Sequence, residues 1–292
     1  MKGFLRDNTK TFLGIGLAAV LVIAISAFLG ITPTDVFGKG VIYEEKTVEA
    51  GTVLYEDQDD DTRQQLYIEE DQQGEEQTYE EFLANPPEYD GEHLYVTVNR
   101  NRPFFTKEEK QNAETFYSYS EFDELGRTGA AFARVTYDSF PEGIRQGDLS
   151  TITPAGWNQM NVKEKYNIML KVKDNLETEY LWARCHVIAF ALGGKELDPR
   201  NVMTGTLSYN MTMRQYEVAV ADFLETCQQD HVLYRVTPTY KGDELIPRGC
   251  LIEGYGVESN GIFINFAAYI FNSQPSFDID YYTGEAVLKT SS

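Results

Sequence analysis

Cysteine is scarce in this sequence. Three cysteines among 292 residues are too few to build a disulfide framework, and at least one thiol must stay unpaired within the chain. The small disulfide-rich scaffolds are therefore excluded. Cys227 and Cys250 could pair with each other if the chain is exported, but nothing in the sequence requires that bond.

Basic residues are also few. Lys and Arg number 25 against 46 Asp and Glu, so the formal net charge is −21, which is the wrong sign for a protein that holds polyanions through its overall charge. Any nucleic-acid function must therefore depend on a local site. Collagen-like and low-complexity classes are excluded as well, because 42% of the residues are hydrophobic and 13% are aromatic, as in an ordinary globular protein.

Charged residues are missing altogether from residues 12–31, a run of twenty residues in which Ser26 is the one polar side chain. As a helix this run would span about 30 Å, the thickness of a bilayer core. We predict a single-pass membrane anchor there. A cleaved signal peptide with its cleavage point near residues 25–27 is the alternative, whereas a buried core helix does not fit a segment without a polar face.

The flanks of this run predict its orientation. Lys2, Arg6 and Lys10 precede it and an increasingly acidic segment follows. Because Lys and Arg residues that flank a membrane span tend to stay on its cytoplasmic side, residues 1–11 are expected in the cytoplasm and residues 32–292 outside it. The sequence thus predicts a protein of the cell membrane with an extracellular domain.

Acidic residues concentrate ahead of that domain. The chain through residue 90 carries a net charge of −13, from 6 basic and 19 acidic residues, and the remainder carries −8. Most of the excess lies in residues 56–81. Since such a run repels itself and stays solvated, we predict an acidic extracellular linker over residues 32–90 and a folded domain over residues 91–292. A calcium-binding loop is the more specific alternative, but these acidic residues lack the Asp-x-Asp-x-Asp-Gly spacing of such a loop.

Alternation of apolar and polar residues, rich in aromatic and β-branched side chains, begins near residue 94 and is typical of half-buried strands. The expected strands cover residues 94–98, 116–122, 129–137, 232–237, 251–255 and 262–270, the second and third forming a hairpin-like pair. Apolar residues then recur at helical spacing over about residues 210–228, which predicts an amphipathic helix. Together these elements predict an α+β fold with a mainly antiparallel central sheet flanked by helices.

Histidine is as scarce as cysteine. His93 and His231 each stand beside an expected strand without a polar constellation, so we interpret both as surface or satisfied core residues. His186 follows Arg184 by two residues in a mainly apolar run that breaks at Gly193-Gly194. In an extended chain, residues two apart share a face, so these two side chains are expected to project the same way.

The next thirty residues add further polar groups. A short strand, a turn and a helix start would place Asn210 near the first helical turn, with Glu217 two turns along roughly the same face. An amide oxygen suits Mg²⁺, and a neutral imidazole can take a proton from water, so the set suits metal-assisted phosphodiester hydrolysis. Each residue also has a plain interpretation: Asn210 as a helix cap, Glu217 as a solvated helix residue and Asn201 as a turn former.

These motifs carry a family resemblance. Residues 182–217, with TPAGWNQ at 153–159 upstream and HVLYRVTP at 231–238 downstream, resemble the DNA/RNA non-specific endonucleases. The nearest branch is the bacterial secreted and DNA-entry nucleases, which have the ββα-metal nuclease fold. The resemblance covers roughly residues 95–282.

The resemblance implies particular roles. It makes His186 the general base, with Arg184 in the same catalytic motif, and Asn210 the single protein ligand of the metal. Glu217 would hold the metal's waters and belongs to both the catalytic and the metal set. Arg127, by a looser correspondence, would contact the substrate phosphate.

Other residues are expected to support the site. Asn201 opens the strand that matches the family's Asn-Leu-Ile-Thr-Gly-Thr element. Arg214 and Arg200 join Arg127 and Arg184 as candidates for a local positive patch, although Arg200 and Arg214 would serve equally as solvated surface charges.

The function implied is a membrane-anchored, extracellular, sugar-non-specific endonuclease. Its substrate would be DNA, with RNA left open, and its cofactor Mg²⁺, with Mn²⁺ as the alternative. Two departures from the family pattern favour a second hypothesis, a tethered nucleic-acid-binding or uptake module with little turnover. Ala183 stands where the family carries Asp or Asn, and the interval between Asn210 and Glu217 is short. A third hypothesis, an acidic adhesin or stalk, depends on residues 56–81 alone.

Overall fold

The computed structural model describes the backbone of residues 42–48, 52–58, 77–157, 167–172, 175–275 and 277–289, and the side chains of all but residues 42–48, 52–58, 167–172 and 175–179. The chain divides into two units, residues 1–39 and 40–292, and all described residues belong to the second. The expected anchor at residues 12–31 lies outside them. Among the described ranges, no helix combines the length and the hydropathy needed to cross a bilayer.

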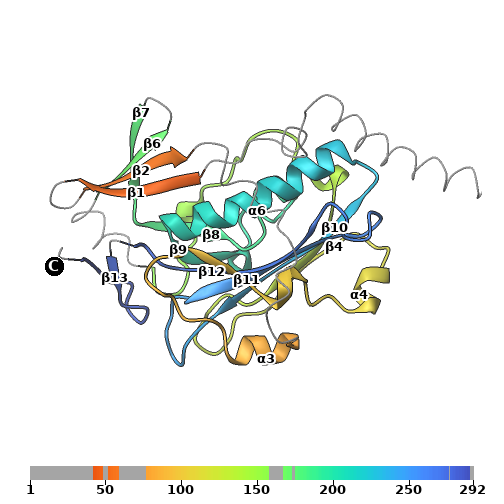
Figure 1. The fold of residues 1–292 in the computed structure, drawn as a ribbon, viewed down its shortest axis with the longest axis horizontal. Helices are drawn as coiled ribbons and strands as arrows, with labels where there is room; N and C mark the ends of the chain where they lie inside the picture. Colours follow the sequence, from red (N-terminus) through yellow and green to blue (C-terminus); the bar gives the residue numbers. More distant parts are fainter. Residues whose placement is uncertain are drawn as a thin grey trace, which may run out of the picture. The chain divides into compact units, whose positions relative to one another are not determined.

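A six-stranded antiparallel sheet forms the centre of the described unit (Figure 1). Its order from one edge to the other is β3 (Tyr95–Thr97), β12 (Asn265–Phe271), β11 (Gly249–Gly256), β10 (His231–Thr239), β5 (Ala131–Thr136) and β4 (Phe116–Tyr119). Each strand falls within or overlaps one of the six expected ones. This confirms the mainly antiparallel α+β fold. The prediction succeeded because alternation of apolar and polar residues is a local signal that marks one buried face of a strand.

The expected hairpin-like pair is confirmed as β4 and β5, with Phe116 opposite Arg134 and Tyr119 opposite Ala131. The first strand ends three residues before the predicted limit. Asp123 explains this, since its carboxylate accepts hydrogen bonds from the backbone N–H groups of Leu125 and Arg127 and turns the chain.

Helix α6 (Leu207–Thr226) lies along one face of this sheet (Figure 1). It buries the stripe that contains Met213, Tyr216, Val220 and Phe223, which confirms the expected amphipathic helix. The helix begins three residues earlier than predicted because the hydroxyl of Thr206 accepts from the N–H of Tyr209 and caps it.

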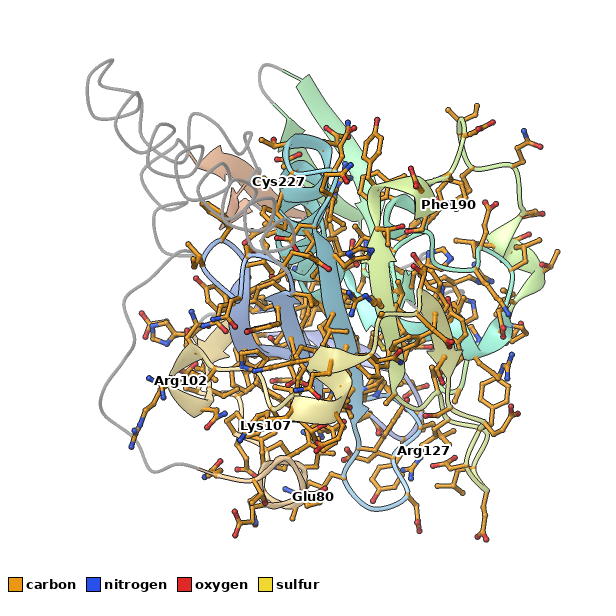
Figure 2. All side chains as sticks on the ribbon, turned by 90° about the vertical axis from the view of Figure 1, so that its right-hand side faces the viewer. Glu80, Arg102, Lys107, Arg127, Phe190 and Cys227 are labelled. Atoms are coloured by element: carbon orange, nitrogen blue, oxygen red, sulfur yellow. The ribbon has the colours of Figure 1, made fainter. Side chains whose placement is uncertain are left out.

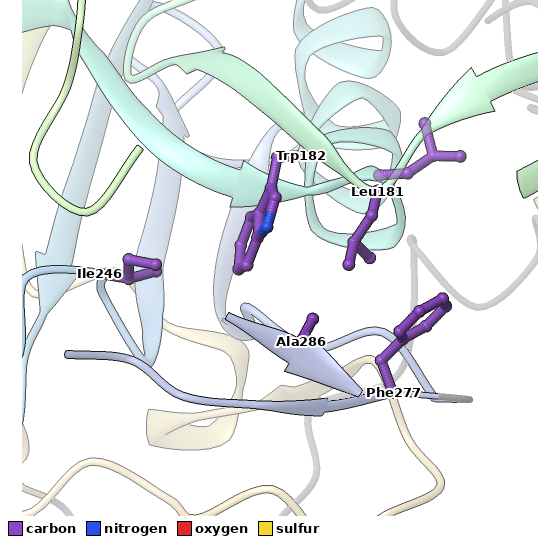
Figure 3. Packing of buried hydrophobic residues seen from close by; sticks show 6 residues of the cluster. Leu181, Trp182, Ile246, Phe277 and Ala286 are labelled. Carbon is purple, nitrogen blue, oxygen red and sulfur yellow. The ribbon is translucent and has the colours of Figure 1, made fainter. Parts of the chain in front are cut away.

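A two-stranded antiparallel ribbon, β8 (Trp182–His186) with β9 (Val202–Thr206), leads directly into α6. The three elements form a ββα unit. A hydrophobic cluster holds the junction of this unit, with Leu181, Trp182 and Leu207 packed against Ile246, Phe277 and Ala286 (Figure 3). The last two belong to the small hairpin of β13 (Phe277–Ile279) and β14 (Ala286–Leu288).

The folded part begins earlier than the predicted boundary at residue 91. Helix α3 (Tyr79–Ala84) starts with a capping box between Thr78 and Glu81, and Phe82 is buried against Leu251, Tyr269 and Phe271 on the face of the sheet opposite α6. The expected linker therefore contains packed structure. Charge composition indicated solvation there because acidic residues dominate the stretch that leads into α3.

Further strands also lie within the expected linker. β1 (Ile42–Val48) pairs with β2 (Thr52–Gln58), and β2 runs parallel to β6 (Asn167–Val172), which pairs with β7 (Asn175–Tyr180). The short helices are α4 (Lys107–Gln111), η2 (Asn99–Asn101), η3 (Tyr137–Ser139), η4 (Leu149–Thr151), η5 (Phe190–Leu192) and η6 (Pro199–Asn201).

All three cysteines are free thiols. Cys185 and Cys250 are buried in β8 and β11, and Cys227 caps the C-terminus of α6. The pairing of Cys227 with Cys250 that the sequence left open is not formed.

Candidate active site

His186 is the last residue of β8, opposite Val202 of β9, and only 7% of its surface is exposed. Its Nε2 lies 3.0 Å from the carbonyl oxygen of Glu196. Because a carbonyl can only accept, Nε2 carries the proton and Nδ1 is left as the basic nitrogen. The fold thereby selects one tautomer of the imidazole.

The charge state of His186 is set by its surroundings. Burial lowers its pKa, and the nearby Arg145 guanidinium lowers it further, against the opposing effect of the hydrogen bond to Glu196. The imidazole is consequently neutral at pH 7, the form that a general base requires.

Arg145 faces the free nitrogen of this imidazole. Its Nη2 lies 3.5 Å from His186 Nδ1 and its Nε lies 3.6 Å from a carboxylate oxygen of Glu196, while 45% of its side chain remains exposed. Glu196 also accepts hydrogen bonds from the N–H groups of Gly147 and Gln146. A partly exposed cation is thus held next to the base.

Neither Arg145 nor Glu196 was identified from the sequence. Arg145 lies 41 residues before His186, and its glycine-flanked loop gives no periodic signal. Glu196 acts on the imidazole through its backbone carbonyl, which every residue possesses. Only packing identifies these two partners.

Asn201 holds the loop between β8 and β9. This fully buried side chain accepts from the N–H of Ile188 at 2.8 Å and donates to the carbonyls of Ile188 at 3.0 Å and Lys195 at 2.9 Å. Gly194 permits the tight path, since a Cβ there would lie 2.0 Å from the Ile188 oxygen. The structure gives Asn201 a supporting position, as the sequence predicted, by fixing the loop that carries Glu196.

Glu217 projects from α6 and is only partly exposed. Burial raises its pKa to about 7, while Arg214 one turn earlier and Arg145 act in the opposite direction. Arg145 therefore lies within electrostatic range of both His186 and Glu217. The structure brings the imidazole, the carboxylate and these two arginines into one region.

Asn210 lies in the second turn of α6, two turns before Glu217, and is partly exposed. Its carboxamide has no hydrogen-bond partner among the described residues, so its oxygen is free to act as a ligand. No group of three or more His, Cys, Asp or Glu side chains suited to a metal occurs in the described ranges. These donors fit a hydrated divalent cation held by Asn210, with Glu217 near its waters, rather than a fully protein-coordinated ion.

Arg184 lies two residues before His186 in β8, and its described contacts are with a preceding loop. Its Nε donates to the carbonyl of Ile152 at 2.6 Å, and its guanidinium stacks 4.0 Å above the ring of Trp157. Arg184 therefore supports the loop at residues 150–157.

The described contacts of the Arg127 side chain are with Asp123 and with residues 240–244. Its guanidinium pairs with Asp123 at 2.6 Å, donates to the carbonyls of Gly242 and Glu244, and stacks on Tyr240. Arg127 lies far from Phe190, whose ring is 5.7 Å from the Arg145 guanidinium (Figure 2). The arginine beside the base is Arg145, whereas the expectation for Arg127 was a contact with the substrate phosphate.

The remaining polar residues singled out from the sequence have local roles. Arg200 forms ion pairs with Asp198 and Glu121, whereas Arg214 is exposed. His93 pairs with Asp90 on the surface and His231 pairs with Glu258, as expected of satisfied histidines. Ala183 faces Gly205 across the ribbon and offers no side-chain hydrogen bond.

A sequence model of the family described as DNA/RNA non-specific endonuclease matches residues 106–255, just over half of the chain. No curated protein matches the chain. Among solved structures, the Sda1 nuclease with a bound zinc ion is 26% identical with a TM-score of 0.54, and the match covers 68% of this chain and 97% of that one.

NucA from Streptococcus agalactiae, solved with no metal and with a magnesium ion, shares the fold at 24% identity and a TM-score of 0.53, over 67% of this chain and 87% of its own. The chain therefore belongs to the DNA/RNA non-specific endonuclease family and is a metal-dependent endonuclease.

Proposed function

We propose that this protein is a membrane-anchored, extracellular, sugar-non-specific endonuclease in which His186 is the general base. The observation that carries this assignment is the tautomer of His186, with Nε2 bound to the Glu196 carbonyl at 3.0 Å and Nδ1 left basic. DNA is the proposed substrate, and RNA is to be tested as a second substrate in the cleavage assay described below.

In the proposed reaction, His186 Nδ1 takes a proton from a water molecule as that water attacks phosphorus. The bond between phosphorus and the 3′ oxygen breaks, that oxygen takes up a proton from solvent to become a hydroxyl, and a 5′ phosphate remains on the product. A positioned base contributes about 10²–10⁴-fold to the rate. Burial serves this role because it keeps the imidazole neutral.

Arg145 is proposed to contact the phosphate under attack. Its guanidinium is exposed enough to meet a substrate and is held 3.5 Å from the base. Arginine suits this role because its planar fork of donors matches phosphate oxygens. Contact with the backbone alone would make the enzyme indifferent to sequence.

Asn210 and Glu217 are proposed to hold one hydrated divalent cation, Mg²⁺ or its substitute Mn²⁺. Such an ion would stabilise negative charge that develops on the phosphate and on the leaving oxygen. The free carboxamide of Asn210 and the partly buried Glu217 carboxylate supply the oxygen donors that Mg²⁺ prefers.

The anchor is proposed at residues 12–31, with residues 1–11 cytoplasmic and the nuclease outside the cell. Support comes from the twenty-residue uncharged run and the basic residues that precede it. Alkaline carbonate extraction of membranes tests the anchor. The full chain should stay in the pellet, and a chain lacking residues 2–31 should not.

The catalytic proposal is tested on the full chain in detergent with plasmid DNA and Mg²⁺. His186→Ala should lose about 10²–10⁴-fold in kcat with little change in DNA binding, and Asn210→Ala should lose metal-dependent cleavage. His93→Ala is the matched control, since that histidine is exposed and paired only with Asp90. Equal cleavage by all four proteins would overturn the mechanism.

The binding-module alternative predicts a different outcome in the same assay. A wild-type chain that binds plasmid equally with and without EDTA, and never cleaves it, would favour a tethered uptake module. This alternative is motivated by Ala183, which stands where the family carries Asp or Asn.

A further inference from the structure

The first turn of α6 is fixed by groups from three separate parts of the chain. The N–H of Leu207 donates to the carbonyl of Leu181 at 2.8 Å, and that of Tyr209 donates to the Thr206 hydroxyl at 3.1 Å. The N–H between them, of Ser208, donates to the side-chain oxygen of Gln274 at 3.2 Å. A helix leaves its first four N–H groups without internal partners, and these are three of the four.

Gln274 comes from a distant segment. It follows β12 by three residues and lies 66 residues beyond Ser208, yet its side chain is fully buried. Its Nε2 has no hydrogen-bond partner. A buried amide with one end unpaired is unfavourable and calls for a specific explanation. Leu or Met would fill the same space at lower cost, so the oxygen is the useful half of this side chain.

The two residues before Gln274 act on the same helix start. Asn272 accepts from the N–H of Thr206 at 2.9 Å and donates to the carbonyls of Thr204 and Pro247. The carbonyl of Ser273 accepts from the Thr206 hydroxyl at 2.7 Å. We call Asn272, Ser273 and Gln274 the C-terminal clamp.

Asn210 lies two residues after Ser208, the last residue that this clamp holds. We propose that Gln274 is a positioning residue of the nuclease, which fixes the first turn of α6 so that the carboxamide of Asn210 is held ready for the metal. The inference depends on the proposed metal role of Asn210. The clamp lies beyond residues 106–255, the segment matched by the family, so the match assigns it no role.

The test measures Mn²⁺ binding to the full chain in detergent by electron paramagnetic resonance, without substrate. Gln274→Met removes the acceptor at similar length and should weaken Mn²⁺ binding by about tenfold or more, as loss of an outer-shell partner does. Gln274→Glu keeps an acceptor at the helix N-terminus and should stay within about threefold of wild type. Gln274→Asn, which withdraws the acceptor, replaces the Met variant if that one does not fold.

Phe82→Leu in α3 is the control for a general loss of stability, because Phe82 packs on the opposite face of the sheet. It should lower the Tm without changing the Kd for Mn²⁺. Wild-type affinity in Gln274→Met or Gln274→Asn, or an equal loss in Gln274→Glu, would overturn the proposal.

An Asn210→Ala variant distinguishes failure of the positioning role of Gln274 from failure of the proposed metal site. If Asn210→Ala abolishes Mn²⁺ binding and Gln274→Met does not weaken it, only the positioning role of Gln274 is wrong. If Asn210→Ala changes nothing, the proposed metal site fails, and the role of Gln274 fails with it.

Discussion

At the scale of single residues, each side chain in the site is defined by what surrounds it. His186 is a base because one nitrogen is bound to a carbonyl and the ring is buried. Asn201 and Asn210 are the same residue type, yet one makes three hydrogen bonds and the other has no described partner. Residue type therefore indicates capacity, and packing decides use.

The pH profile tests the surroundings of His186. Its pKa is lowered, so the neutral base persists to below the ordinary value of 6.5, and kcat should fall only as the pH drops further. Arg145→Gln removes a nearby positive charge and should move this acidic limb of kcat to higher pH. Lys107→Gln, at an exposed position, should not move it, and an unmoved limb in Arg145→Gln would count against the proximity of that charge.

Glu217 gives a second pH-dependent prediction, for stability without metal. Its folded pKa of about 7 exceeds its ordinary value of 4.5, so the folded state favours the protonated form and loses stability as the pH rises through 7. Glu217→Gln removes that loss. In EDTA, the variant should gain several degrees in Tm over wild type near about pH 8.5 and much less near about pH 5.

Differential scanning calorimetry at the two pH values checks this prediction. The Tm gain of Glu217→Gln should be larger at the higher pH. An exposed and freely hydrated carboxylate would give the same Tm offset at both pH values. A smaller gain at the higher pH would contradict the assigned burial.

At the scale of elements, the loop between β8 and β9 matters as much as the strands. It carries the Glu196 carbonyl to His186 and the Glu196 carboxylate to Arg145. One buried side chain, Asn201, ties both ends of the loop together. The loop is therefore part of the rigid support of the base.

Asn201→Ala should damage both stability and catalysis. Three backbone groups lose their partner in a buried site, at about 1–3 kcal/mol each, so the free energy of unfolding should fall by about 3 kcal/mol or more. Urea unfolding and kcat measure the two effects. Asn112→Ala is the control, since its carboxamide accepts only the exposed N–H of Glu114, and equal effects of the two substitutions would refute the role of the loop.

At the scale of the whole molecule, the charge balance limits substrate binding. Residues beyond 90 carry a net charge of −8. Among the described residues, Arg145 lies beside His186 and Arg214 acts on Glu217. Since only local cations meet the phosphates, affinity should depend on few ion pairs and be modest.

Salt should therefore act mainly on KM. Two phosphate contacts predict a slope near −2 when the logarithm of affinity is plotted against the logarithm of salt concentration. Affinity should then fall about fifteenfold between roughly 50 and 200 mM salt. Steady-state cleavage in NaCl measures KM and kcat separately. A much steeper slope would show that further cations contact the substrate.

The sequence by itself determined much of the architecture. Alternation predicted the strands of the central sheet, helical spacing predicted α6, and the motif around His186 indicated the family, because each of these signals is carried by residues close together in the chain. Capping shifted one boundary by three residues, as the Thr206 hydroxyl shows.

Only the tertiary structure decided which groups meet. Arg145 lies beside the base, Glu196 acts through its backbone, and α3 packs where charge predicted a linker. Arg145 and α3 contact segments that are distant in the chain, and Glu196 acts through a group that every residue has. These contacts arise from the packing of loops against the sheet, for which no short stretch of sequence carries a signal.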